Sequence, residues 1–278
     1  MLNHQDSLLF LSHWVILFSL KAKGAYLSIL RWGPSRRVFR SIRGQMLKLF
    51  GQPDPFADLA RVAHSTKADL FLDIGCHHGD TLIRFLEAGI RCPTVAFDPL
   101  EQNLKIARKT LSRFPEVRFE QLALSDEDGA AKFFVNRNEQ TSSLLENASG
   151  NLDSFRKDTE HLASIEVAVC KLDTWFARQP QPCPRSILVK CDTQGAEEKV
   201  VRGGIHLFKN YVTAIYAEVM LGEMYQGQSD FPGLRKLLEK DCGMILHNIY
   251  PCLHDDQGRA VQLDALWIRP EAAGPSLH

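Results

Sequence analysis

The chain has 278 residues, of which 45% are hydrophobic and 24% charged, and it contains 16 Phe and 4 Trp. This ordinary globular composition excludes collagen, a coiled coil and a disordered chain, and the length favours one large α/β domain with an appendage. Basic and acidic residues both number 33, so the net charge is zero and we expect no nucleic-acid partner.

Residues 1–50 are the appendage, and their charge is uneven. Eight Lys and Arg residues stand against Asp6 alone, so this arm carries +7 and the rest of the chain −7. Its apolar run over residues 8–20 is shorter than the roughly 20 residues that a membrane-spanning helix needs. We therefore predict a helical arm that either packs on protein, including a second subunit, or lies at an anionic membrane surface as a peripheral contact.

Two features of the sequence help to predict the cellular compartment: the number of cysteines and the composition of residues 1–7. The seven cysteines are odd in number and form no CxxC pair, a pattern that favours a reduced compartment. Residues 1–7 contain no Lys or Arg and carry Asp6, which disfavours a secretory signal. We expect a cytoplasmic protein, associated with a membrane if the arm is an interfacial helix.

From residue 69 short apolar runs alternate with amphipathic stretches, a pattern typical of a mostly parallel sheet with helices on both faces. A strand over 70–74, a glycine turn and a helix from Asp80 come first. Residues 130–170 break the rhythm and are interpreted as an insertion near the site, with strands at 132–135 and 165–169. The other strands are predicted at 95–97, 117–124, 187–192, 214–219, 244–250 and 265–268.

The last two of these strands favour an antiparallel hairpin at the end of the sheet. Residues 51–278 are thus expected to form one doubly wound α/β domain.

The turn after the first strand has the composition of a nucleotide-binding turn. Asp73 precedes Gly75 and Gly79, and the helix that begins beside Thr81 offers free N–H groups to a ligand. A dinucleotide fingerprint would need a middle glycine, which is missing. An acid in this turn would repel a pyrophosphate, but it suits the cationic amino-acid end of S-adenosylmethionine.

Two further strand ends carry acids. Asp98 closes the second strand, where a carboxylate can accept two hydrogen bonds from a ribose diol. Ser125 and Asp126 end the third strand and are placed to flank adenine. Each acid by itself is equally well explained as a turn or capping residue, and it is their order on successive strands that favours the cofactor.

These residues resemble the FkbM-type S-adenosylmethionine-dependent methyltransferases over about residues 69–269. The most specific string is K-x-D-x-Q-G-A-E at 190–197. Two departures stand out: the family usually has Glu where Asp98 stands, and a small residue and Asn where Cys76 and His77 stand. The other matching strings are F-L-D-I-G-x-x-x-G at 71–79, A-F-D-P at 96–99 with Asn103, A-L-S-D at 123–126 with Gly129, T-S-S-L at 141–144, K-L-D-T-W at 171–175 and A-E-V at 217–219.

The resemblance implies a class I methyltransferase: a seven-stranded Rossmann-like sheet with a final antiparallel strand, which binds S-adenosyl-L-methionine and methylates a hydroxyl of a small molecule or saccharide. Methyl transfer requires alignment and removal of one proton, and Asp192 and Glu218 are the catalytic candidates on the rim of the sheet. Each is equally well explained as a structural carboxylate. The predicted cofactor-binding residues are Asp73, Gly75, Cys76, His77, Gly79, Thr81, Asp98, Ser125 and Asp126.

Three further expectations complete the sequence-based hypothesis. A module that binds S-adenosylmethionine without transferring methyl, in regulation or assembly, stays open as the alternative, and the missing middle glycine counts against nicotinamide. Residues 222–227, including Tyr225, are expected to form part of a lid over the acceptor. We expect no metal at His77 and His78, because adjacent rings point different ways and no nearby Cys or carboxylate completes a tetrahedral set.

Overall fold

The computed structural model describes residues 53–148, 159–179 and 184–273. The arm 1–50, with its two alternative placements, lies outside these residues. The chain divides into two compact units, Met1–Gln52 and Pro53–His278, and everything below concerns the second. Within the described ranges, no helix is long and apolar enough to cross a membrane.

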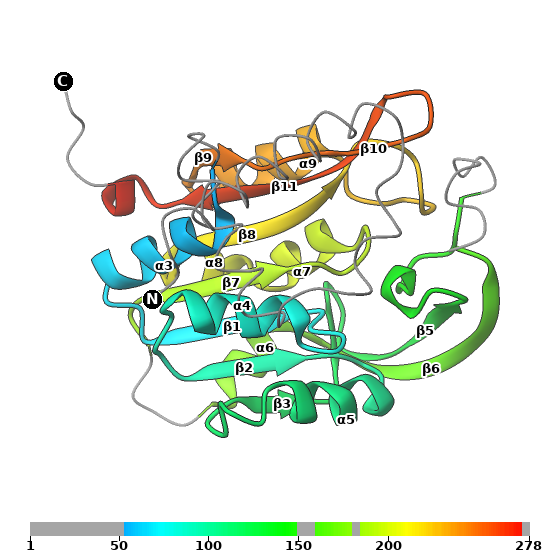
Figure 1. Cartoon of the computed structure of the whole chain (residues 1–278), viewed down its shortest axis with the longest axis horizontal. Helices are drawn as coiled ribbons and strands as arrows, with labels where there is room; N and C mark the ends of the chain where they lie inside the picture. The colour runs from blue at the N-terminus through cyan, green and yellow to red at the C-terminus, as the bar shows by residue number, and fades with distance from the viewer. Residues whose placement is uncertain (1–52, 149–158, 180–183, 274–278) are drawn as a thin grey trace, which may run out of the picture. The chain divides into compact units, whose positions relative to one another are not determined.

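An eight-stranded central sheet forms the core of this unit (Figure 1). Its strands run in the order β3-β2-β1-β7-β8-β11, and β9 and β10 both pair with the outer edge of β11. The first five are parallel, and β11 is antiparallel to β8. The bounds are β1 Leu70–Ile74, β2 Thr94–Phe97, β3 Arg118–Glu120, β7 Ile187–Cys191, β8 Val212–Met220, β9 Ile245–Ile249, β10 Leu253–His254 and β11 Ala260–Ile268.

This order confirms the predicted doubly wound, Rossmann-like class with an antiparallel strand at its end. The expected seven strands correspond to seven positions in the sheet, because β9 and β10 share one edge.

Helices cover both faces of the sheet, because its parallel strands are apolar on both sides. The fully buried Leu59, Phe85 and Leu104 pack α3, α4 and α5 on one face. The buried Leu172 and Phe208 belong to the helices on the other face, α6 to α9 (Figure 1). The bounds are α3 Pro55–Ser65, α4 Asp80–Ala88, α5 Glu101–Thr110, α6 Leu172–Ala177, α7 Glu197–Gly203, α8 Ile205–Asn210 and α9 Phe231–Lys236, with the short turns η3 Glu139–Thr141, η4 Leu237–Asp241 and η5 Pro270–Ala273.

The predicted insertion contributes to a second, three-stranded sheet in the order β4-β6-β5. β5 Gly129–Asn136 and β6 His161–Lys171 form an antiparallel pair, longer than predicted. The prediction of one strand over 117–124 was wrong, because β3 stays in the central sheet while β4 Ala123–Ser125 pairs with β6. No Gly or Pro separates β3 from β4, so the sequence gives no sign of this change of partner.

Candidate active site

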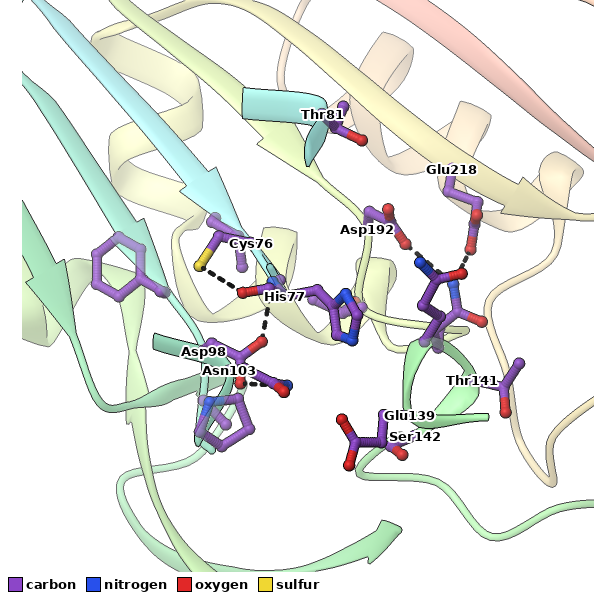
Figure 2. A pocket seen from close by; sticks show the side chains of 18 of the residues that line it. Cys76, His77, Thr81, Asp98, Asn103, Glu139, Thr141, Ser142, Asp192 and Glu218 are labelled. Atoms are coloured by element: carbon purple, nitrogen blue, oxygen red, sulfur yellow. Dashed lines mark hydrogen bonds between the residues drawn. The ribbon is translucent and has the colours of Figure 1, made fainter. Parts of the chain in front are cut away.

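A cavity of about 380 Å³ opens at the carboxyl ends of the central parallel strands (Figure 2). Its walls come from the turn after β1, the end of β2, the loop after β7, strand β8 and the segment around η3. The predicted site residues that line it are Gly75, Cys76, His77, Thr81, Asp98, Asp192 and Glu218. The structure therefore brings both catalytic candidates and five of the cofactor candidates to one cavity.

Four predicted cofactor residues do not line the cavity. Ser125 and Asp126 lie at the end of β4, where the Asp126 carboxylate is 3.5 Å from Lys199 Nζ. Gly79 is the N-cap residue before α4 and has a left-handed φ of 78°, and a Cβ there would lie 2.9 Å from Leu111 Cδ1. These residues have structural roles in the surrounding elements. The sequence pattern does not distinguish such a role from contact with a ligand.

Asp73 is the fourth of these residues, and it holds a buried cation. It is fully buried, and its Oδ1 lies 3.1 Å from Lys190 Nζ, which also donates to the Gly75 carbonyl oxygen at 2.6 Å. Burial alone would lower the pKa of Lys190, but the carboxylates of Asp73 and Asp192 raise it above its ordinary value. Asp73 thus fixes a charged Lys190 beneath the turn, instead of facing the cavity as predicted.

On the β1–β2 side, the Asp98 carboxylate accepts three hydrogen bonds from nearby residues. Oδ1 accepts from Leu100 N–H at 2.9 Å and Asn103 Nδ2 at 3.1 Å, and Oδ2 accepts from His77 N–H at 3.0 Å (Figure 2). Burial raises the pKa of Asp98, while these three hydrogen bonds lower it. Oδ2, which has one protein donor, is the oxygen with capacity left for a ligand.

The turn that carries His77 approaches the neighbouring chain closely. A Cβ on Gly75 would lie 1.9 Å from the Asp192 carbonyl oxygen, and Gly75 has a φ of 79°. Only glycine fits there. His77 itself has a φ of 46°, which its hydrogen bond to Asp98 stabilises.

On the β7–β8 side, the Gln194 side chain joins the two catalytic candidates. Its Nε2 donates to Asp192 Oδ1 at 3.0 Å and to Glu218 Oε2 at 2.5 Å (Figure 2). The amide of Gln262, on β11, donates to the other oxygen of Glu218. Burial, followed by the charge of Asp192, raises the pKa of Glu218 well above its ordinary range.

Tyr225 lies behind Gln194, in the predicted lid segment. Its hydroxyl is 2.9 Å from Gln194 Oε1 and 2.9 Å from the Thr141 carbonyl oxygen, and its one proton serves one of these acceptors at a time. Tyr225 is fully buried and is not among the residues that line the cavity, so it supports the wall of the site from behind.

The segment that follows β5 forms a wall that sequence reasoning missed in part. Glu139, Thr141 and Ser142 line the cavity (Figure 2). Ser143 Oγ donates to the Gln194 carbonyl oxygen at 2.8 Å. The string T-S-S-L at 141–144 was a signal that this segment belongs to the site. Gln262 carried no such signal, because it reaches the cavity only through the pairing of β11 with β8.

His77 and His78 contradict both reasons given for excluding a metal. Their rings stack with centroids 3.6 Å apart and planes at 25°, so they do not point different ways. A carboxylate is also near, because Glu139 Oε2 lies 3.8 Å from His78 Nε2. Burial and the neighbouring His78 lower the pKa of His77 to about 4, so this ring is neutral at pH 7.

Comparisons with known proteins agree with the sequence strings. A family profile described as "Methyltransferase FkbM domain" matches residues 73–246. A relative named 2-O-methyltransferase NoeI, from Sinorhizobium fredii (strain NBRC 101917 / NGR234), is 26% identical over 207 residues, which cover 71% of this chain and 76% of the relative.

Solved methyltransferase structures are more distant. The 1,6-didemethyltoxoflavin-N1-methyltransferase of Burkholderia thailandensis is 10% identical with a TM-score of 0.39, covering 86% of this chain and 91% of that one. The N-methyltransferase NodS of Bradyrhizobium japonicum WM9 is 10% identical with a TM-score of 0.39, covering 78% and 98%. At such scores the fold assignment rests on the strand order itself.

The profile spans more than half of the chain and contains the turn after β1, Asp98, Asp192 and Glu218. The chain therefore belongs to the FkbM methyltransferase family, and S-adenosyl-L-methionine is its expected cofactor.

Proposed function

We propose that the protein transfers the methyl group of S-adenosyl-L-methionine to a hydroxyl oxygen of a small molecule or saccharide. The observation that carries this proposal is the placement of Asp192 and Glu218 in the same cavity as the His77–Asp98 side. A methyl acceptor that loses a proton needs a carboxylate or similar base at the reacting centre. The similar protein NoeI is named a 2-O-methyltransferase, which supports oxygen as the acceptor atom.

The residues present fit the cofactor. Asp98 Oδ2 has capacity for a ribose hydroxyl, and the close approach at Gly75 leaves the turn free of side-chain bulk beside the cavity. When bound, the cofactor supplies an electrophilic methyl group on a positively charged sulfur.

The protein's contribution is alignment and one proton transfer. The oxygen–methyl bond forms while the sulfur–methyl bond breaks, and the electron pair of the broken bond stays on sulfur, which leaves S-adenosylhomocysteine. Asp192 takes the acceptor proton, since its side chain lines the cavity and is 32% exposed. Its Oδ1 accepts from Gln194, and its Oδ2 lies 3.5 Å from Lys190 Nζ. Glu218, bound by two amides, orients the acceptor from the adjacent strand.

The test combines binding and turnover on the full chain. Calorimetric titration should give binding of S-adenosylmethionine and S-adenosylhomocysteine and none of NAD. Labelled S-adenosylmethionine should then pass its methyl group to members of a panel of polyols, saccharides and phenols. Binding of the cofactor without transfer to any of them would favour the alternative, a regulatory or assembly module, and binding of NAD alone would refute the cofactor.

A further inference from the structure

His77, His78 and Glu139 bring three metal-ligating side chains to one edge of the cavity. The two histidines come from the turn after β1 and the glutamate from η3, and all three line the cavity. One ligand atom of each lies within 4.8 Å of the others. This is the distance scale at which three side chains can close on one ion.

The two imidazoles also have unused nitrogen atoms. Nε2 of His77 and Nε2 of His78 are buried and have no hydrogen-bond partner in the part of the chain that the structure describes. A buried polar atom without a hydrogen-bond partner costs free energy. Two such atoms side by side therefore point to one ligand that both imidazoles bind.

An ordinary ion pair does not explain the arrangement. His78 Nε2 and Glu139 Oε2 are 3.8 Å apart, which is too far for a hydrogen bond. The His78 ring instead stacks on the His77 ring, with centroids 3.6 Å apart.

We propose that His77, His78 and Glu139 form a binding site for a divalent metal ion of the zinc class. Two neutral imidazoles and one carboxylate are a set that suits Zn²⁺ or Co²⁺, whereas Mg²⁺ and Ca²⁺ prefer oxygen ligands. Glu139 Oε1 accepts from Gln102 Nε2 at 3.3 Å, which leaves Oε2 for the ion. Three protein ligands leave a coordination position open towards the cavity.

This site goes beyond the proposed methyl transfer, since no step of that reaction uses it. Glu139 lies 61 residues after His78 in the chain, and η3 follows β5 of the second sheet. The side chain of Glu139 is 40% exposed, so it can move towards an ion without unpacking the core.

The experiment measures metal binding directly on the full chain, without a histidine tag and after treatment with a chelator. Titration with Co²⁺ alone should give visible absorption bands that saturate at one equivalent, and Zn²⁺ should displace them. His78→Asn and Glu139→Gln should each weaken Co²⁺ binding by at least about tenfold, because each removes a ligand. His64→Asn, which removes an exposed imidazole from the last turn of α3, should leave it unchanged.

The failing outcomes are distinct from those of the proposed function. An absence of Co²⁺ bands, or Co²⁺ affinity that is equal in the wild type, His78→Asn and Glu139→Gln, would overturn the metal site. S-adenosylmethionine binding of the wild-type protein is measured in a separate titration without metal. If the wild-type protein did not bind S-adenosylmethionine, the proposed function would be refuted, and the result of the metal titration would be unaffected.

Discussion

The two sides of the cavity hold their carboxylates in different ways. On the β1–β2 side, Asp98 accepts from two backbone N–H groups and one nearby amide, all within 21 residues of it. On the β7–β8 side, Glu218 depends on side-chain amides, those of Gln194 from the loop after β7 and Gln262 from β11.

This difference indicates which side of the cavity is fixed by the backbone and which side can be altered by single side-chain substitutions. Two of the three donors to Asp98 are backbone N–H groups, whose positions are set by the turns that carry them, so the Asp98 side is organised mainly by the local fold. Side-chain amides can be replaced one at a time without changing the fold, and burial already raises the pKa of Glu218 there. We therefore expect changes on the β1–β2 side to affect cofactor affinity and changes on the β7–β8 side to affect turnover.

The largest effect is expected from Asp192→Asn. Asparagine keeps the size of the side chain and an oxygen for Gln194, but it cannot take a proton. Methyl transfer should fall by about 100-fold or more, while the affinity for S-adenosylmethionine stays within a few-fold. Calorimetry and a labelled-methyl assay check the two halves, and retained turnover would make Asp192 a structural residue.

Replacement of Glu197, at the start of α7, is expected to change the free energy of unfolding by a similar amount. Its Oε1 accepts from Thr193 N–H and Thr193 Oγ1, whereas Oε2 is buried without a partner in the described part of the chain. Burial raises its pKa from 4.5 to about 7. Between these two pH values the folded protein binds more protons than the unfolded one, so stability falls as the pH rises through this window.

Glu197→Gln mimics the protonated form and should remove that part of the pH dependence. The free energy of unfolding of the variant, relative to the wild type, should rise by on the order of 3 kcal/mol between pH 4.5 and pH 8. Urea titrations at several pH values measure it. Parallel curves for the two proteins would show that Glu197 does not titrate in this range.

A smaller effect, on cofactor affinity, is expected from Asp98→Ala. Loss of the carboxylate removes a charge-assisted hydrogen bond to the cofactor, which should weaken binding by about 1–3 kcal/mol. Asp126→Ala is the matched control, because Asp126 was also predicted to bind the cofactor but does not line the cavity. Equal affinities of the two variants in calorimetry would contradict the division between the two sides.

Tyr225→Phe should have a smaller effect again. It removes one hydroxyl that supports Gln194 from behind, with a cost of about 1 kcal/mol in stability. Because Gln194 joins Asp192 to Glu218, the pH profile of turnover should shift while cofactor affinity does not change. An unchanged pH profile would limit Tyr225 to a packing role.

The smallest effect on cofactor affinity is expected from removing residues 1–50. We propose that this arm either packs on protein or contacts an anionic membrane surface, and its charge of +7 and its apolar run make the second alternative testable. The full chain should sediment with anionic liposomes at low salt and dissociate partly at high salt. The shortened chain should lose this binding and keep its cofactor affinity, and equal liposome binding of the two would exclude the arm as an anchor.

The sequence by itself determined the fold class and most of the cofactor side. The apolar runs at 70–74 and 187–192, the glycine turn between Asp73 and Gly79, and Asp98 all act over short stretches of chain, where hydrophobic pattern and turn chemistry are informative. These features alone are enough to predict that Gly75, His77 and Asp98 lie at one rim of the sheet.

Only the tertiary structure decided which of those acids face the cavity and what else joins them. Asp73 turned inward because Lys190, on the adjacent strand, is buried and needs a counter-charge. Glu139 and Gln262 reached the site through sheet pairings of β5 with β6 and of β8 with β11. The sequence pattern of a strand shows which of its faces is apolar but not which strand it will pair with, so contacts that depend on distant pairing stay hidden until the chain is folded.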